Sequence, residues 1–94
     1  MNHLVHGDLV RRIDEYRGGI PTLRLLIADL EAFALDQEWR RREHDAFRKE
    51  WGKLEEVYAT AIERNPPSMT PIDTRRVRRS LDEIKTLLSG HRAG

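Results

Sequence analysis

Apolar residues recur along this chain at steps of three and four positions, the spacing that places side chains on one side of an α-helix. The longest stripe lies in a highly charged segment and consists of Trp39, Phe47, Trp51, Leu54, Tyr58, Ala61 and Ile62. It predicts an amphipathic helix over residues 37–64. Asp36 precedes this segment and can accept hydrogen bonds from the free N–H groups of the first turn.

Two earlier segments have the same spacing. Residues 5–17 form the first, and Gly18 and Gly19 end it because glycine readily adopts the left-handed conformation that closes helices. Residues 21–35 form the second, which starts at Pro21, where no backbone N–H is needed. We expect this most hydrophobic segment to be the central helix. The two stripes are Leu9, Val10, Ile13 and Tyr16, and Leu23, Leu26, Ile27, Leu30, Phe33 and Ala34.

A fourth helix is predicted over residues 71–89, after a proline-containing loop at 65–70. Thr70 and Asp73 have the spacing of a capping box, in which each side chain accepts a hydrogen bond from the backbone N–H of the other residue. Ser89 and Gly90 end the helix, and residues 90–94 form a tail. The buried stripe consists of Val77, Leu81, Ile84 and Leu88. The short connections favour an all-α, single-domain, antiparallel four-helix bundle, with its core centred on 21–35 and the second half of 37–64.

The length of the third predicted helix sets a geometric problem. An unbroken helix over 37–64 measures about 42 Å, whereas a globular domain of this size is about 32 Å across. We therefore expect a bend at Gly52, a projecting end, or a partner that covers the overhang. Gly52 costs a helix about 1 kcal/mol relative to alanine, so it also predicts a close approach of another helix.

The composition fits one soluble domain with few special chemistries. The chain has 94 residues, of which 38% are hydrophobic and 35% charged, and its net charge of +1 does not favour an anionic membrane as a partner. It has no cysteine, which excludes disulfides and thiolate sites and fits a reducing cytoplasm, where we place the protein. No apolar stretch approaches the roughly 20 residues of a membrane span, and no signal-peptide pattern is present.

Positive charge is concentrated near the carboxyl end, where residues 65–94 hold six basic and three acidic residues. Four of the basic residues project opposite the apolar stripe of the fourth helix: Arg75, Arg76, Arg78 and Arg79. A solvated outer face explains this arrangement, and the alternatives are contact with an acidic protein or with nucleic acid. Aromatic residues are not interleaved with these arginines, which disfavours nucleic acid.

Polar residues continue the apolar stripe at the start of the third predicted helix. Arg40 and His44 fall beside the arc set by Phe47, Trp51 and Leu54. The helix can simply run past the core here, with Arg40 covering Trp39. Alternatively, Trp39, Arg40, His44 and Phe47 form a partner-binding surface, because tryptophan and arginine are enriched at protein interfaces.

Catalytic and metal-binding patterns are absent from the sequence. His3 and His6 are three residues apart, but no carboxylate at a suitable offset completes a metal site. Asp29, Glu55 and Glu56 are the carboxylates nearest the packing stripes, without a nucleophile or base in a recognisable order. We therefore expect no enzymatic activity, no metal and no cofactor.

Three segments resemble a group of small all-helical bacterial proteins: residues 16–20, residues 26–31 and residues 51–59. The resemblance extends over residues 16–62, mostly at core and turn positions. Some proteins of this type are immunity partners that neutralise a toxin domain. The resemblance therefore implies tight binding to a cognate protein, without catalysis.

These observations give one leading hypothesis and two alternatives. The leading hypothesis is a cytoplasmic, non-catalytic protein-binding module, an immunity-type inhibitor of a toxin, that binds through the start of the third predicted helix. The first alternative is a nucleic-acid-binding regulator that uses the arginines of the fourth. The second is a homodimeric structural subunit that buries the excess length of the third.

Overall fold

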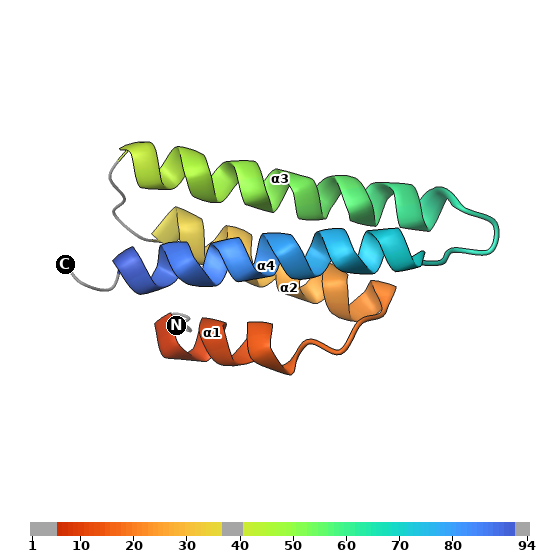
Figure 1. Ribbon diagram of the computed structural model, residues 1–94, viewed down its shortest axis with the longest axis horizontal. Coiled ribbons are helices and arrows are strands. Elements are labelled where there is room, and N and C mark those ends of the chain that lie inside the picture. Colours follow the sequence, from red (N-terminus) through yellow and green to blue (C-terminus); the bar gives the residue numbers. More distant parts are fainter. Residues whose placement is uncertain (1–5, 37–40, 92–94) are drawn as a thin grey trace.

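The chain forms four helices that run alternately up and down (Figure 1). The computed structural model describes residues 6–36 and 41–91, and this part of the chain contains no strand. The helices are α1 (His6–Glu15), α2 (Ile20–Asp36), α3 (Arg41–Glu63) and α4 (Pro71–His91). The predicted all-α antiparallel four-helix bundle is confirmed. The predicted start of the third helix at Gln37 lies outside the described residues.

Of the two helix ends predicted from glycines, one agrees with the structure and one does not. Gly18 and Gly19 have positive φ angles of 105° and 94° and lie in the turn between α1 and α2, as predicted. The predicted stop at Ser89 and Gly90 is wrong, because α4 continues to His91. A single glycine lowers helix stability by only about 1 kcal/mol, which is too little to end a helix by itself.

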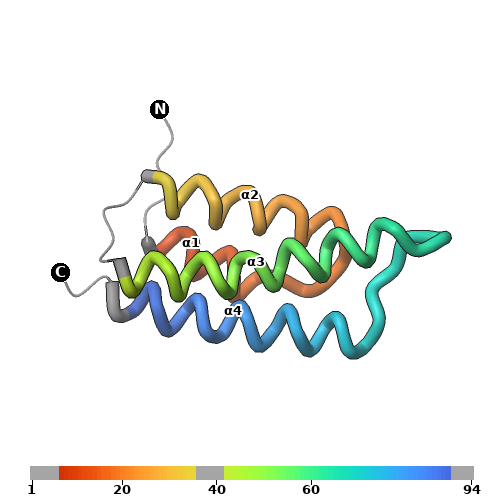
Figure 2. Tube along the Cα trace, turned by 90° about the horizontal axis from the view of Figure 1, so that it is seen from above, coloured from red at the N-terminus to blue at the C-terminus, as the bar shows by residue number. Residues whose placement is uncertain are grey.

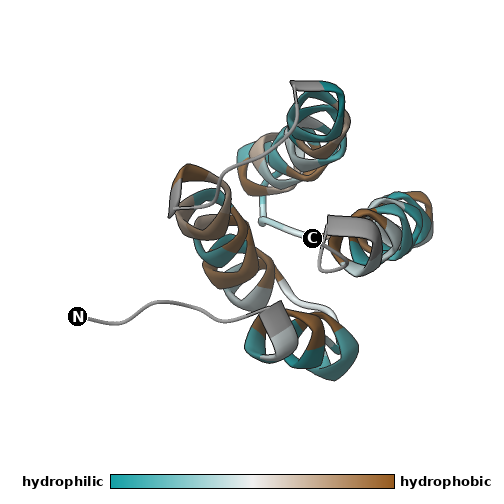
Figure 3. Cartoon of the chain, turned by 90° about the vertical axis from the view of Figure 1, so that its left-hand side faces the viewer, coloured by the Kyte–Doolittle hydropathy of each residue, from teal (hydrophilic) through white to brown (hydrophobic). Residues whose placement is uncertain are grey.

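Each helix packs against two neighbours, so that the four form a ring (Figures 2 and 3). The neighbouring pairs are α1–α2, α2–α3, α3–α4 and α4–α1, and α3–α4 is the most extensive. α2 and α4 lie at opposite corners, and their backbones do not approach each other closely. The expectation that the second helix is central is therefore wrong. α2 is apolar around much of its circumference, and only part of that surface is covered.

The predicted apolar stripes supply most of the core, with two corrections on α3. Val57 is buried, because it follows Leu54 by three residues and precedes Ala61 by four. Ile62 is 44% exposed, because it is turned by about 100° from Ala61. The core consists of Leu9, Ile13, Leu23, Leu26, Ile27, Leu30, Phe33, Phe47, Leu54, Val57, Val77, Leu81, Ile84 and Leu88.

Two aromatic residues of α3 pack at the margin of this core. Trp51 and Tyr58 are partly buried against it. The indole Nε1–H of Trp51 also donates a hydrogen bond to the carbonyl oxygen of Ile27, at 3.0 Å. This contact fixes the position of α3 against α2, because it satisfies the only polar group of a large apolar side chain.

The length of α3 is accommodated by the shape of the whole bundle. The molecule measures 44 × 28 × 19 Å, so a helix of 23 residues, about 34 Å long, fits along its longest axis. α3 passes through Gly52 as one helix, and a Cβ added there would meet no atom within 4 Å. The predicted close approach at Gly52 is therefore wrong, because the glycine faces open space.

Candidate functional site

The outer side of α2 carries an exposed apolar surface. Leu25 and Leu35 are 64% and 82% exposed, and Ala28 and Ala32 between them are also exposed. Steps of three, four and three residues place these four side chains on one side of the helix. We call this surface, made of Leu25, Ala28, Ala32 and Leu35, the α2 face. It contains no polar side chain over three turns of helix.

A groove lies on each side of the α2 face. The first separates α1 from α2 and has a volume of about 260 Å³. The second separates α2 from α3, with a volume of about 180 Å³. Leu25 lines the first groove and Leu35 the second, so the two exposed leucines form walls of recesses. The other residues of the second groove are Glu31, Ala34, His44, Phe47, Arg48 and Trp51.

A carboxylate, Glu31, lies beside the carboxyl end of the α2 face, in the groove that Arg48 also lines. Glu31, which adjoins Ala32 and lines the second groove, is exposed and forms no ion pair within the described part of the chain. The last turn of α2 contains no basic residue that would offset the negative end of the helix dipole. Asp29 differs, because Arg12 of α1 binds it at 2.6 Å.

The predicted partner-binding set is only partly available at this surface. Trp39 and Arg40 lie outside the described residues. His44 is partly exposed and lines the groove between α2 and α3. Phe47 also lines this groove, but it is 1% exposed, so its side chain offers little surface to a partner. It precedes Trp51 by four residues and therefore points into the bundle on the same side of α3.

The four arginines of α4 are all exposed, as predicted, but they lie over different parts of the bundle. Arg76 and Arg79 line a groove between α3 and α4. Arg78 lines a different groove, between α1 and α4, that also contains Tyr16. Burial raises the pKa of Tyr16, and the positive charge of Arg78 lowers it in part. Arg75 lines neither groove.

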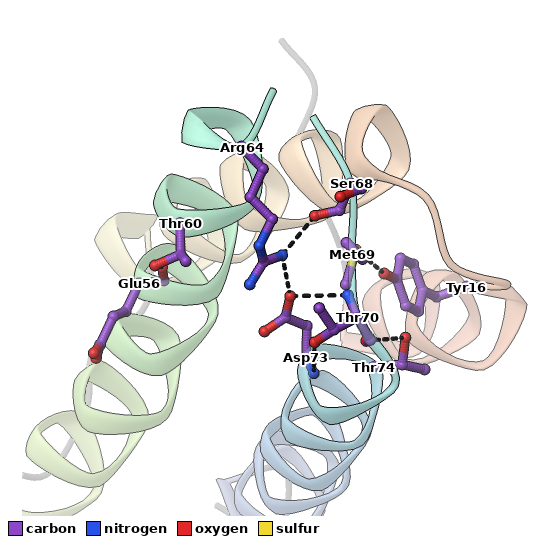
Figure 4. A network of polar contacts seen from close by, with 9 residues as sticks. All are labelled: Tyr16, Glu56, Thr60, Arg64, Ser68, Met69, Thr70, Asp73 and Thr74. Carbon is purple, nitrogen blue, oxygen red and sulfur yellow. Dashed lines mark hydrogen bonds and ion pairs between the residues drawn. The ribbon is translucent and has the colours of Figure 1, made fainter. Parts of the chain in front are cut away.

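A polar network holds the start of α4 (Figure 4). The N–H of Asp73 donates to Thr70 Oγ1 at 3.1 Å, and the N–H of Thr70 donates to Asp73 Oδ2 at 3.0 Å, so the predicted capping box forms. Arg64, which follows α3, also donates to Asp73 Oδ2 at 2.5 Å and to the carbonyl oxygen of Ser68 at 2.6 Å. The Arg64 side chain and the Thr70 N–H lower the pKa of Asp73. Arg64, Ser68, Thr70 and Asp73 organise the fold and line none of the grooves described above.

The described residues include the candidate carboxylates but not both of the candidate histidines. They contain no group of three His, Asp or Glu side chains that could hold a metal ion, and His3 lies outside them. Asp29 is paired with Arg12, while Glu55 and Glu56 are exposed. None of the described helices combines the length and apolarity that crossing a bilayer requires.

Comparison with known proteins adds no relative. No family model, no curated protein and no solved structure matches the chain.

Proposed function

We propose that this protein is a non-catalytic protein-binding module that docks through the α2 face. The exposure of Leu25 and Leu35 on the outer side of α2 carries the proposal. Burying one leucine side chain contributes about 1.5–3 kcal/mol, so two of them supply a substantial part of a binding energy. Exposed apolar side chains next to recesses are typical of protein interaction sites.

The chemistry of the α2 face supports a partner with apolar side chains and a basic group. Apolar side chains of the partner cover Ala28 and Ala32, whose small size allows close approach, and fill the grooves beside the two leucines. A basic group of the partner lies opposite Glu31, where the carboxylate and the helix end are negative together. His44 and Phe47, which belong to the partner-binding set predicted from the sequence, line the second groove, and His44 is the more exposed of the two.

We further propose that the partner is a toxin domain and that the protein acts as an immunity-type inhibitor. The resemblance over residues 16–62 supports this narrower proposal. An inhibitor of this kind acts by covering its target, which requires a binding surface and no catalytic group.

The test uses the protein encoded by the neighbouring gene, because an inhibitor is normally made together with its target. Affinity is measured by calorimetry for the natural chain and for Leu25→Glu and Leu35→Glu. Ile72→Glu is the matched control, since Ile72 is 57% exposed on α4, away from the α2 face. We expect each leucine variant to lose at least about tenfold in affinity, the equivalent of 1.4 kcal/mol, and the control to bind normally.

Two results would contradict the proposal. One is a complex that forms equally well with all three variants, because the α2 face is then not the contact. The other is a natural chain that forms a dimer by itself and a Leu35→Glu variant that is monomeric, both measured by light scattering. In that case a second copy occupies the α2 face.

A further inference from the structure

The groove between α3 and α4 has the features of an anion-binding site. We propose that it binds an oxyanion of the phosphate class through Arg76, Arg79 and the hydroxyl group of Ser80. This inference goes beyond the proposed function, because it concerns a different surface and a small ligand. The groove has a volume of about 330 Å³ and is lined by Lys53, Glu56, Val57, Arg76, Arg79 and Ser80.

Ser80 is the first observation that points to a ligand. The residue is 2% exposed, and its hydroxyl group makes no hydrogen bond within the described part of the chain. Three other helical hydroxyl groups, on Thr60, Thr74 and Thr86, each donate to the carbonyl oxygen four residues earlier. Buried polar groups are nearly always paired. A ligand oxygen in the groove would provide the partner that Ser80 lacks.

The two arginines provide the second observation. Arg76 and Arg79 are exposed and form no ion pair with any described residue. They lie one helical turn apart, and Ser80 follows Arg76 by four residues on the same side of α4. Guanidinium groups bind phosphate oxygens through two parallel hydrogen bonds. One turn of α4 therefore presents two planar cationic donors and one hydroxyl group to the same groove.

The α3 side of the groove restricts the kind of anion. The ammonium group of Lys53 pairs with Glu50 at 3.1 Å, so it adds positive charge to the groove, but part of its hydrogen-bonding capacity is already used. Glu56 contributes a carboxylate to the lining. This carboxylate repels a polyanion that runs along the groove, but two guanidinium groups outweigh it for a compact anion at the α4 wall. The geometry therefore favours a single phosphate group over a nucleic acid strand.

The experiment titrates the intact chain with inorganic phosphate or phosphoserine at constant ionic strength, and follows backbone amide NMR shifts. The groove variant is Arg76→Gln with Arg79→Gln. The control is Arg75→Gln with Arg78→Gln, which removes the same charge from the same helix but leaves the groove intact. We expect saturable shifts near Ser80 for the natural chain and the control, and at least about tenfold weaker binding for the groove variant.

Ser80→Ala gives a separate test of the hydroxyl group. It leaves both arginines in place, and we expect it to weaken phosphate binding several-fold while the amide spectrum shows an unchanged fold. Tighter binding of phosphoserine than of inorganic phosphate would identify a phosphate ester as the ligand; the reverse order would identify the free ion.

Either of two results overturns the inference. The first is the absence of any saturable shift with both phosphate compounds. The second is equal weakening by both double variants, because binding then depends on diffuse positive charge over α4. A helix that binds nucleic acid through all four arginines would also give this second result, because each arginine would then neutralise a phosphate.

Discussion

Asp73 connects three parts of the chain through a single carboxyl group. It is 5% exposed, and its Oδ2 atom accepts hydrogen bonds from Thr70 and Arg64. Sequence reasoning predicts the Thr70 contact, because capping residues have a fixed spacing. It misses Arg64, because that side chain reaches Asp73 only when the loop after α3 folds back. Local motifs are therefore predictable here, whereas their supporting contacts depend on tertiary structure.

The first prediction concerns the charge of Asp73. Asp73→Asn keeps the size of the side chain but removes the anion that Arg64 binds, so we expect a loss of about 1–3 kcal/mol in unfolding free energy at pH 7. Folding lowers the pKa of Asp73. Its stabilising effect is therefore complete above the unfolded pKa, about 4, and disappears as the pH falls through the lower folded value.

Urea unfolding at pH 7 and at progressively lower pH measures this effect. The difference between the natural chain and Asp73→Asn should decrease below about pH 4 as the natural chain loses its advantage. A difference that stays the same down to the acid unfolding of both proteins would contradict the assignment of the effect to the Asp73 charge.

At the scale of the element, α3 contains a glycine, Gly52, at a position where packing would also allow a larger residue. A Cβ at Gly52 would meet nothing within 4 Å. Gly52→Ala should therefore raise the unfolding free energy by about 0.5–1 kcal/mol, because alanine has the higher helix propensity and restricts the unfolded chain. Equilibrium urea unfolding measures the change.

Gly18→Ala is the matched control for this substitution. Space is also open around Gly18, but its φ angle of 105° is one that side-chain-bearing residues rarely adopt. The same chemical change should therefore destabilise the protein. If Gly52→Ala also lowers stability, the glycine has a role in α3 that its surroundings do not reveal.

The helices differ in how far the sequence determines their role. On α4 the stripe of Val77, Leu81, Ile84 and Leu88 is buried as predicted, because charged residues leave it only one apolar side. On α2 the apolar residues outnumber those that the bundle can cover. Leu25 and Leu35 lie off the predicted stripe, and this excess was the available signal for the α2 face. Periodicity alone does not indicate which side faces a neighbour.

The candidate site shows the same limit. The sequence places Phe47 and His44 on one helix, three residues apart, but burial depends on where α2 packs. Likewise, the four arginines of α4 form one outer arc in projection, and only the position of α3 assigns Arg76 and Arg79 to a groove. The fold class could therefore be predicted from local patterns, whereas the surfaces required the arrangement of neighbouring helices.

At the scale of the whole molecule, α1 is attached less extensively than the other helices. Leu9 and Ile13 anchor it in the core, and two ion pairs, Arg12–Asp29 and Lys85–Asp14, hold its exposed side. Exposed ion pairs contribute little and are screened by salt. We therefore expect α1 to open before the rest of the bundle.

Native-state hydrogen exchange tests this order. Backbone amides of α1 should exchange faster than those in the middle of α3 and α4, and the difference should increase at high salt. Uniform protection across all four helices would contradict the prediction, because it would mean that the bundle opens only as a single cooperative unit.

The separation of α2 from α4 bears on whether the proposed protein partner and the proposed anion can bind together. These helices lie at opposite corners of the ring (Figure 3), so the proposed protein site and the α4 wall of the proposed anion groove lie on different helices. The two proposals together predict that both ligands bind at the same time. A ternary complex of chain, protein and phosphate could assemble in either order, and α3, which packs against both α2 and α4, would transmit any cooperativity between the two.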